Sequence, residues 1–202
     1  MKKVLILIIL IHLFACEKSK LCSDVIKSKP DNHLISDSEL KTVISLFKSN
    51  NLNLDNFLIY RLQKDDLGYT HVRCYQYINN LNVFSDDVIF HFDKQGHYYF
   101  LSGELISNID IKPSPSMDVR EVIKLFFHNV ENDGFYSNNK KQIEDGCFLC
   151  ELGYFDLNAG TSYASQNFRL VWRIRPEESE YPYAFINDSD NTLIYYDNGI
   201  RY

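Results

Sequence analysis

Residues 71–84 read HVRCYQYINNLNVF, and apolar and polar side chains largely alternate up to the asparagines at positions 79 and 80. Alternation with a period of two is typical of a half-buried strand, and paired asparagines are typical of a tight turn. We therefore predict a strand over residues 71–78 that turns back at Asn79 and Asn80.

The neighbouring segments extend this hairpin into a longer meander. Residues 56–62 read as an earlier strand, and residues 83–84 and 88–92 continue the sheet after the turn. Residues 93–96 read DKQG, which places a glycine in a hairpin turn, where positive φ is cheapest for glycine. The sequence thus predicts a set of antiparallel strands, the last of which covers residues 97–101.

A helix is predicted before these strands. Ser36 and Glu39 have the spacing of a capping box, and the apolar residues of the next three turns recur every three or four positions. The helix should cover residues 37–49. The first half of the chain is therefore one helix followed by an antiparallel sheet.

The second half shows the same order of elements. Residues 112–116 read KPSPS and mark a domain boundary, and Ser116 is expected to cap a helix over residues 117–130. A polar loop follows at residues 131–146. Further strands are predicted at residues 147–157, 168–175, 183–187 and 192–196. The pattern predicts an α+β fold of two units, each a helix packed on an antiparallel sheet.

The amino terminus has the features of an export signal. Lys2 and Lys3 precede an apolar run at residues 4–11, which is shorter than a membrane span. The residues that follow, LFAC, end at Cys16 and resemble the lipobox of bacterial lipoproteins. That resemblance implies a signal peptide over residues 1–15, acylation of Cys16 and a lipid anchor in the bacterial cell envelope. An ordinary secretory signal with a chance cysteine is the alternative. Residues 16–33 are polar and are expected to form a flexible tether.

The charge balance argues against nucleic acid as a partner. The chain carries 21 basic and 27 acidic side chains, a formal net charge of −6. After the signal peptide, its longest basic cluster is the pair Lys140 and Lys141, whereas a phosphate-binding surface needs clustered lysine and arginine. The partners expected from the sequence are a membrane, through Cys16, and another protein.

Residues 71–84 resemble the fungalysin/thermolysin propeptide motif, in which a strand beginning His-Val-Arg leads through a turn to Val-Phe. Residues 88–96 and the SGEL sequence at 102–105 are similar to the hairpin that closes that domain. Residues 170–174 and 187–194 resemble, more weakly, a strand and a hairpin of the PepSY-type domain that follows it. The resemblance implies two cystatin-like units, over residues 34–112 and 113–202. Asparagine replaces the family's glycine at positions 80 and 191, and its proline at position 82.

In that family the propeptide precedes a zinc metalloprotease, assists its folding and inhibits it. These 202 residues contain no His-Glu-x-x-His sequence, the zinc-binding pattern of such proteases. The resemblance therefore implies a non-catalytic module that inhibits a thermolysin-like metalloprotease, or helps it fold, in trans. The alternative is a structural or adhesive module of the envelope surface without a protease partner.

Cysteines and histidines offer only weak candidates for chemistry. Cys147 and Cys150 have redox spacing, but a strand at this place would put their sulfurs on opposite faces. They are expected to be core residues, or one of them pairs with Cys74 or Cys22. His91 and Asp93 share a predicted strand face, whereas His97 is expected on the other, which leaves too few ligands for a metal. No metal, cofactor or catalytic residue is predicted.

Three residues of the motif are candidates for contact with a partner. Arg73, Tyr75 and Gln76 lie on the predicted strand at residues 71–78, and arginine and tyrosine are favoured at binding hot spots. Arg73 and Gln76 should fall on opposite faces of a regular strand, and pairing with acidic residues within the sheet is the other role considered for them. Trp172 is expected in the core of the second unit.

Overall fold

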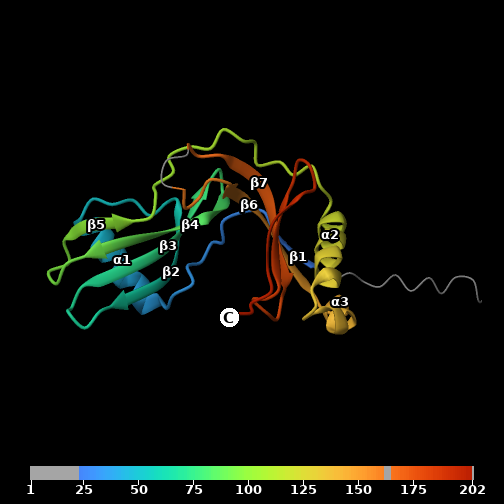
Figure 1. The fold of residues 1–202 in the computed structure, drawn as a ribbon. Coiled ribbons are helices and arrows are strands. Elements are labelled where there is room, and N and C mark those ends of the chain that lie inside the picture. Colours follow the sequence, from blue (N-terminus) through green and yellow to red (C-terminus); the bar gives the residue numbers. More distant parts are fainter. Residues whose placement is uncertain (1–22, 162–164, 202) are drawn as a thin grey trace, which may run out of the picture.

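The computed structural model describes residues 23–161 and 165–201, arranged as two lobes placed side by side (Figure 1). The signal peptide, Cys16 and Cys22 lie outside these residues. Among the described residues, no helix is long and apolar enough to cross a membrane. The predicted α+β class, with a helix packed on an antiparallel sheet in each half, is confirmed.

The first lobe contains one helix and four strands, and it matches the predicted order. They are α1 (Asp37–Ser49), β2 (Phe57–Lys64), β3 (Thr70–Ile78), β4 (Leu81–Phe92) and β5 (Tyr98–Ser102). The side chain of Ser36 caps α1 and that of Glu39 bonds back to Ser36, so the predicted capping box is present. Val43 and Phe47 of α1 pack on one face of the sheet and leave its other face without a helix.

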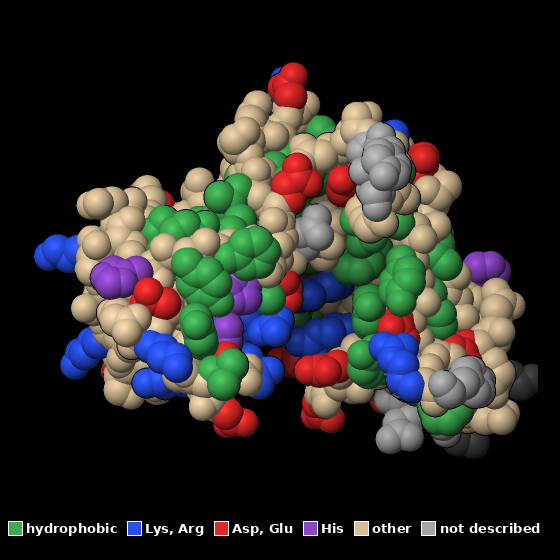
Figure 2. Space-filling view, turned by 60° about the vertical axis from the view of Figure 1, so that its left-hand side comes forward, with side chains coloured by type: hydrophobic (Ala, Val, Ile, Leu, Met, Phe, Trp, Pro, Cys, Tyr) green, Lys and Arg blue, Asp and Glu red, His purple; other side chains and the backbone are tan. Residues whose placement is uncertain are grey.

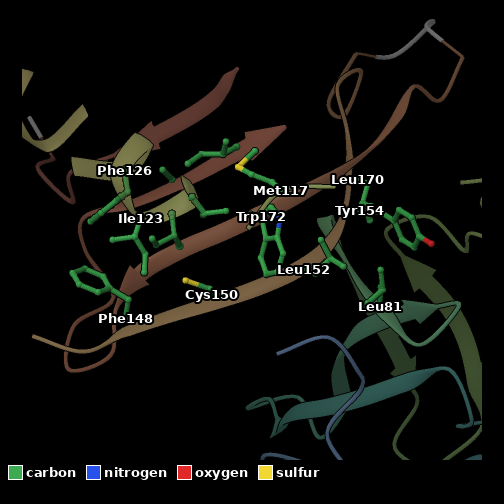
Figure 3. Packing of buried hydrophobic residues seen from close by; sticks show 14 of the residues in the cluster. Leu81, Met117, Ile123, Phe126, Phe148, Cys150, Leu152, Tyr154, Leu170 and Trp172 are labelled. Atoms are coloured by element: carbon green, nitrogen blue, oxygen red, sulfur yellow. The ribbon is translucent and has the colours of Figure 1, made fainter. Parts of the chain in front are cut away.

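The second lobe has its own core around α2. Its elements are α2 (Val119–Asn132), η1 (Ser137–Asn139), α3 (Lys140–Glu144), β6 (Phe148–Asp156), β7 (Phe168–Pro176), β8 (Tyr183–Asn187) and β9 (Leu193–Asp197). Phe126 of α2 and Trp172 of β7 are fully buried in this core, as predicted for Trp172. Leu81 of β4 reaches into the same cluster (Figure 3).

The two lobes share one nine-stranded sheet, which the sequence did not predict. Asn82 and Val83 of β4 pair in parallel with Gly153 and Tyr154 of β6. A second parallel pairing joins β1 (Ser23–Ile26) to β6, while the remaining pairings are antiparallel. β4 therefore belongs to both lobes, and its buried residues contribute to the second core.

The expectation of a flexible tether over residues 16–33 is wrong for its second half. β1 lies on β6 in the second lobe, and the Lys29 ammonium then donates to the backbone oxygen of Asp55 at 2.6 Å. The Nδ1 atom of His33 accepts the amide of Ile59 in the first lobe at 3.0 Å. Backbone pairing and hydrogen bonds thus hold residues 23–33 to both lobes.

The second helix begins later than predicted, and the predicted cap has another role. Asp118 is the N-cap of α2 and forms a capping box with Glu121. Ser116, the expected cap, instead donates its hydroxyl to Asp188, at 2.6 Å from the backbone oxygen and 2.8 Å from the Oδ2 atom. The polar loop expected at residues 131–146 contains η1 and α3.

The cysteines have separate environments. Cys150 is a free, buried core residue, as is Cys74 in the first lobe, and burial raises the pKa of each thiol to about 12. Cys147 is disulfide-bonded. Because Cys74 and Cys150 are both free, neither a Cys147–Cys150 redox pair nor a bond to Cys74 is present; the remaining candidate, Cys22, lies outside the described residues.

Candidate functional site

The helix-free faces of the two lobes line a hollow between them. Figure 2 shows lysine and arginine side chains gathered there, beside acidic, histidine and hydrophobic side chains. Tyr75 of β3 lies near the second lobe, because the charges of Arg173 and Glu151 in that lobe act on the pKa of its phenol. The hollow therefore presents side chains from both lobes on one continuous surface.

A β-bulge in β2 changes what this surface carries. Ile59 pairs with Cys74, and the next pair is Arg61 with Arg73, so Tyr60 is an extra residue. A bulge re-aims side chains, and here Tyr60 and Arg61 both lie on the helix-free face. Arg61 is consequently placed directly opposite Arg73, in an arrangement of like charges that does not stabilise a sheet.

Tyr60 and Tyr75 form a stacked pair next to these arginines. Their ring centroids are 4.4 Å apart with planes at 19°. The Tyr60 hydroxyl donates to the Oδ2 atom of Asp87 at 2.5 Å. Burial and this bond raise the pKa of Tyr60 to about 12, so the phenol stays protonated and the bond persists at neutral pH. The stack is thereby fixed in one geometry.

Arg61 and Arg73 differ from Arg173, the arginine that the second lobe contributes to the hollow. Arg173 pairs with the carboxylate of Glu151 and lies 5.0 Å from the ring centroid of Phe84. The ion pairs among the described residues include neither Arg61 nor Arg73. The Nε atom of Arg73 is also buried, with no hydrogen-bond acceptor among the described residues. These two guanidinium groups thus keep unused bonding capacity.

Gln76 does not face a partner. Its side chain is 3% exposed, its amide nitrogen donates to the backbone oxygen of Ile106, and its amide oxygen accepts the Ile106 N–H. The residue fastens the segment after β5 to β3, because both of its polar groups are used inside the fold. Its prediction as a contact residue is corrected, whereas Arg73 and half-buried Tyr75 do lie on the helix-free face.

A chain of hydrogen bonds crosses the same face of β3, β4 and β5. The Nδ1 atoms of His71 and His91 are 2.8 Å apart, His71 Nε2 is 3.2 Å from Asp65 Oδ2, and His91 Nε2 is 2.9 Å from Ser102 Oγ. If His71 donates to Asp65, its Nδ1 atom accepts from His91, and the Ser102 hydroxyl donates to His91. We call these four residues the histidine relay. If both Nδ1 atoms carried protons, two donors would face each other and the hydrogen bond between the histidines would be lost.

The stability of the fold should fall as the pH drops below about 6.5, the usual pKa of histidine. Burial, with positive neighbours, lowers the pKa of both His33 and His91. Below pH 6.5 the unfolded chain therefore binds protons that the folded chain still resists, and the free energy of unfolding decreases with falling pH. Urea unfolding at pH 7.5, 6.0 and 5.0 measures this slope. The double variant His33→Gln/His91→Gln should flatten it, and an unchanged slope would contradict the assignment.

The histidines are grouped differently from the prediction. In the wide turn after β4, Asp93 pairs with His97, whose Nδ1 atom lies 3.2 Å from the Asp93 carboxylate. His91 faces His71 instead, because the two are register partners in β3 and β4. Within the described residues, no group of three or more histidine, cysteine or acidic side chains could hold a metal ion.

Sequence reasoning missed Tyr60, Arg61 and the histidine relay. A signal for the bulge was present, because Ile59 and Leu62 are three positions apart and both contribute to the first core, which breaks a strict alternation. The pairing of His71 with His91 depends on a register set twenty residues apart. The turn at Asn79 and Asn80 gives that register only if the irregular stretch of β4 between Asn82 and Asp87 is known.

Comparison with known proteins gives one sequence match and a distant structural likeness. Residues 55–105 match the family described as the Fungalysin/Thermolysin Propeptide Motif, and this segment contains the four strands of the first lobe. No curated protein matches the chain. The C-terminal domain of YpeB from Bacillus megaterium is similar at 9% identity and a TM-score of 0.40, over 85% of this chain and 68% of that one. The PepSY-type assignment of residues 113–202 stays a prediction.

Proposed function

We propose that this protein is a non-catalytic, propeptide-like module that binds a thermolysin-like metalloprotease supplied by another chain, inhibits it or assists its folding, and is held at a membrane by lipidated Cys16. The observation that carries the proposal is the propeptide-motif match over residues 55–105. That segment forms the sheet whose helix-free face holds Tyr60, Arg61, Arg73 and Tyr75.

The side chains on the helix-free face support binding of another protein across a broad surface. Tyrosine and arginine are enriched at the hot spots of protein interfaces, and this face carries two of each. The histidine relay pairs its polar atoms with one another, so it stiffens the face that a partner would meet. Inhibition by such a face would be stoichiometric.

Membrane anchoring would compensate for the lack of a covalent link. A propeptide attached to its protease acts at an effective concentration on the order of millimolar. A module on a separate chain must bind tightly or be concentrated in another way, and a lipid at Cys16 would place it on the surface that an exported protease crosses.

The proposal is tested by titrating a mature thermolysin-like metalloprotease with the chain from Glu17 onward, which keeps every described element. Stoichiometric inhibition, or an increased yield of refolded protease, is expected, with an unrelated serine protease unaffected. Neither effect up to about 0.1 mM, where binding worth about 5.5 kcal/mol would be visible, would refute protease binding. The structural or adhesive alternative would then be favoured.

Anchoring is tested separately in the full-length chain. Cys16→Ser removes the sulfur that would be acylated, so the protein should leave the membrane fraction and lose the mass of its acyl chains. A variant that partitions as the parent does would remove the lipid anchor from the proposal and leave protease binding untouched.

A further inference from the structure

We propose that Arg61 and Arg73 form a carboxylate-binding pair on the helix-free face of the first lobe, which recognises an acidic segment of the partner protein with the Tyr60–Tyr75 stack as its aromatic contact. The proposal deepens the proposed function by naming the chemistry of recognition. It rests on that function only for the identity of the partner as a protease.

The first argument is that placing Arg61 opposite Arg73 costs free energy in the chain without a partner. Arg61 and Arg73 are register partners on adjacent strands, and like charges directly opposite each other destabilise a sheet. The bulge at Tyr60 creates this pairing, because a regular strand would have turned Arg61 toward the other face. An anion between the two guanidinium groups would turn the repulsion into attraction.

The second argument is bonding capacity. A guanidinium offers five N–H donors in a planar fork that matches a carboxylate. Arg173, in the same hollow, is paired with Glu151, whereas Arg61 and Arg73 have no ion pair among the described residues. Arg73 does hydrogen-bond with the side chain of Tyr60, but its buried Nε atom has no acceptor there. Asp87 lies on the same face, but its Oδ2 atom accepts from Tyr60.

The third argument is that the surroundings suit a protein segment. The chain is acidic overall, with a net charge of −6, so two unpaired arginines side by side are a local exception. Rigid tyrosines lie at one end of the pair, and the exposed aromatic residues Tyr99 and Phe100 of β5 lie at the other end of the sheet, against His91. Aromatic flanks around a cationic centre favour a peptide chain with acidic side chains.

The test uses a matched pair of charge reversals in the chain from Glu17 onward. Arg61→Glu/Arg73→Glu changes the helix-free face, and Lys41→Glu/Lys48→Glu makes the same change of charge on exposed positions of α1, which covers the opposite face. The arginine variant should bind the protease at least about tenfold more weakly, while the lysine variant stays within about twofold. Thermal melts confirm that both variants are folded. Equal effects of the two double variants would overturn the proposal.

A second measurement separates this proposal from the proposed function. Hexaglutamate peptide is titrated into the isotope-labelled protein. The NMR signals of Arg61, Arg73 and the two stacked tyrosines should shift in the wild type, and the tyrosine signals should stay in place in the arginine variant. Shifts without protease binding would support the carboxylate-binding pair and refute the protease as its partner. Absence of these shifts would overturn the carboxylate-binding pair even if the protease is inhibited.

Two other occupants are tested with the same variants. Binding to phosphatidylglycerol vesicles that the arginine variant loses, without a response to hexaglutamate, would identify a lipid headgroup site instead. A dimer in sedimentation equilibrium that only the arginine variant abolishes would identify a second copy of the chain. Either result would overturn the proposal of an acidic partner segment.

Discussion

Asp188→Ala should lower the free energy of unfolding by about 3–5 kcal/mol, because it removes one acceptor from several buried donors at once. The Asp188 side chain accepts the N–H groups of Ser116 at 2.7 Å and Met117 at 3.1 Å, and the indole N–H of Trp172 at 2.9 Å. Trp172 and Met117 are buried, so these donors would lose their partner without gaining water. The melting temperature of a chain of this size should fall by about 10 °C.

The matched control is Asp190→Ala, two residues further along the same hairpin. Asp190 is exposed, and within the described part of the chain its side chain bonds only to Thr192, so its removal should cost less than about 1 kcal/mol. Urea unfolding followed by the fluorescence of Trp172, the one tryptophan of the chain, measures both variants. Similar midpoints for the two would mean that the Asp188 network does not hold the linker at residues 112–116 onto the second lobe.

Local signals in the sequence were sufficient for α1 and most strands. The capping box at Ser36 and Glu39 acts within one turn, so it could be read directly, and α1 begins and ends where predicted. The start of α2 was misread because Ser116 and Asp118 are both good caps. Only Asp118 has a glutamate three residues later, and this local signal would have decided the question.

The connections between the lobes could not be read in the same way. Asn82 pairs with Gly153, and Ser23 with Phe148, across separations that leave no periodic pattern in the sequence. Residues 23–26 are short and polar enough to resemble a linker, yet parallel pairing with β6 satisfies their backbone groups. For the site, Arg73 and Tyr75 could be predicted, but the Arg61–Arg73 pairing depends on a bulge, which is a property of the sheet.

Gly153→Ala should separate the lobes where β4 meets β6. A Cβ atom at this position would lie 2.6 Å from the backbone oxygen of Asn82 and 2.4 Å from a ring carbon of Phe84. The phenyl ring can turn away, but the oxygen belongs to the strand that pairs with Gly153, so β4 itself must shift. Overpacking of this kind costs about 1–3 kcal/mol, and the upper end is expected because backbone is involved.

The change should also reduce the cooperativity between the lobes. Fluorescence of Trp172 reports unfolding of the second lobe. Alkylation of the buried Cys74 thiol, separated from that of Cys150 by peptide mass spectrometry, reports opening of the first. In the parent the two signals should change at one urea concentration, because β4 contributes to both cores; in Gly153→Ala they should separate. Gly134→Ala is the control, since a Cβ there meets no atom within 4 Å. A single shared transition at the parent's midpoint in Gly153→Ala would show that the β4–β6 pairing does not couple the lobes.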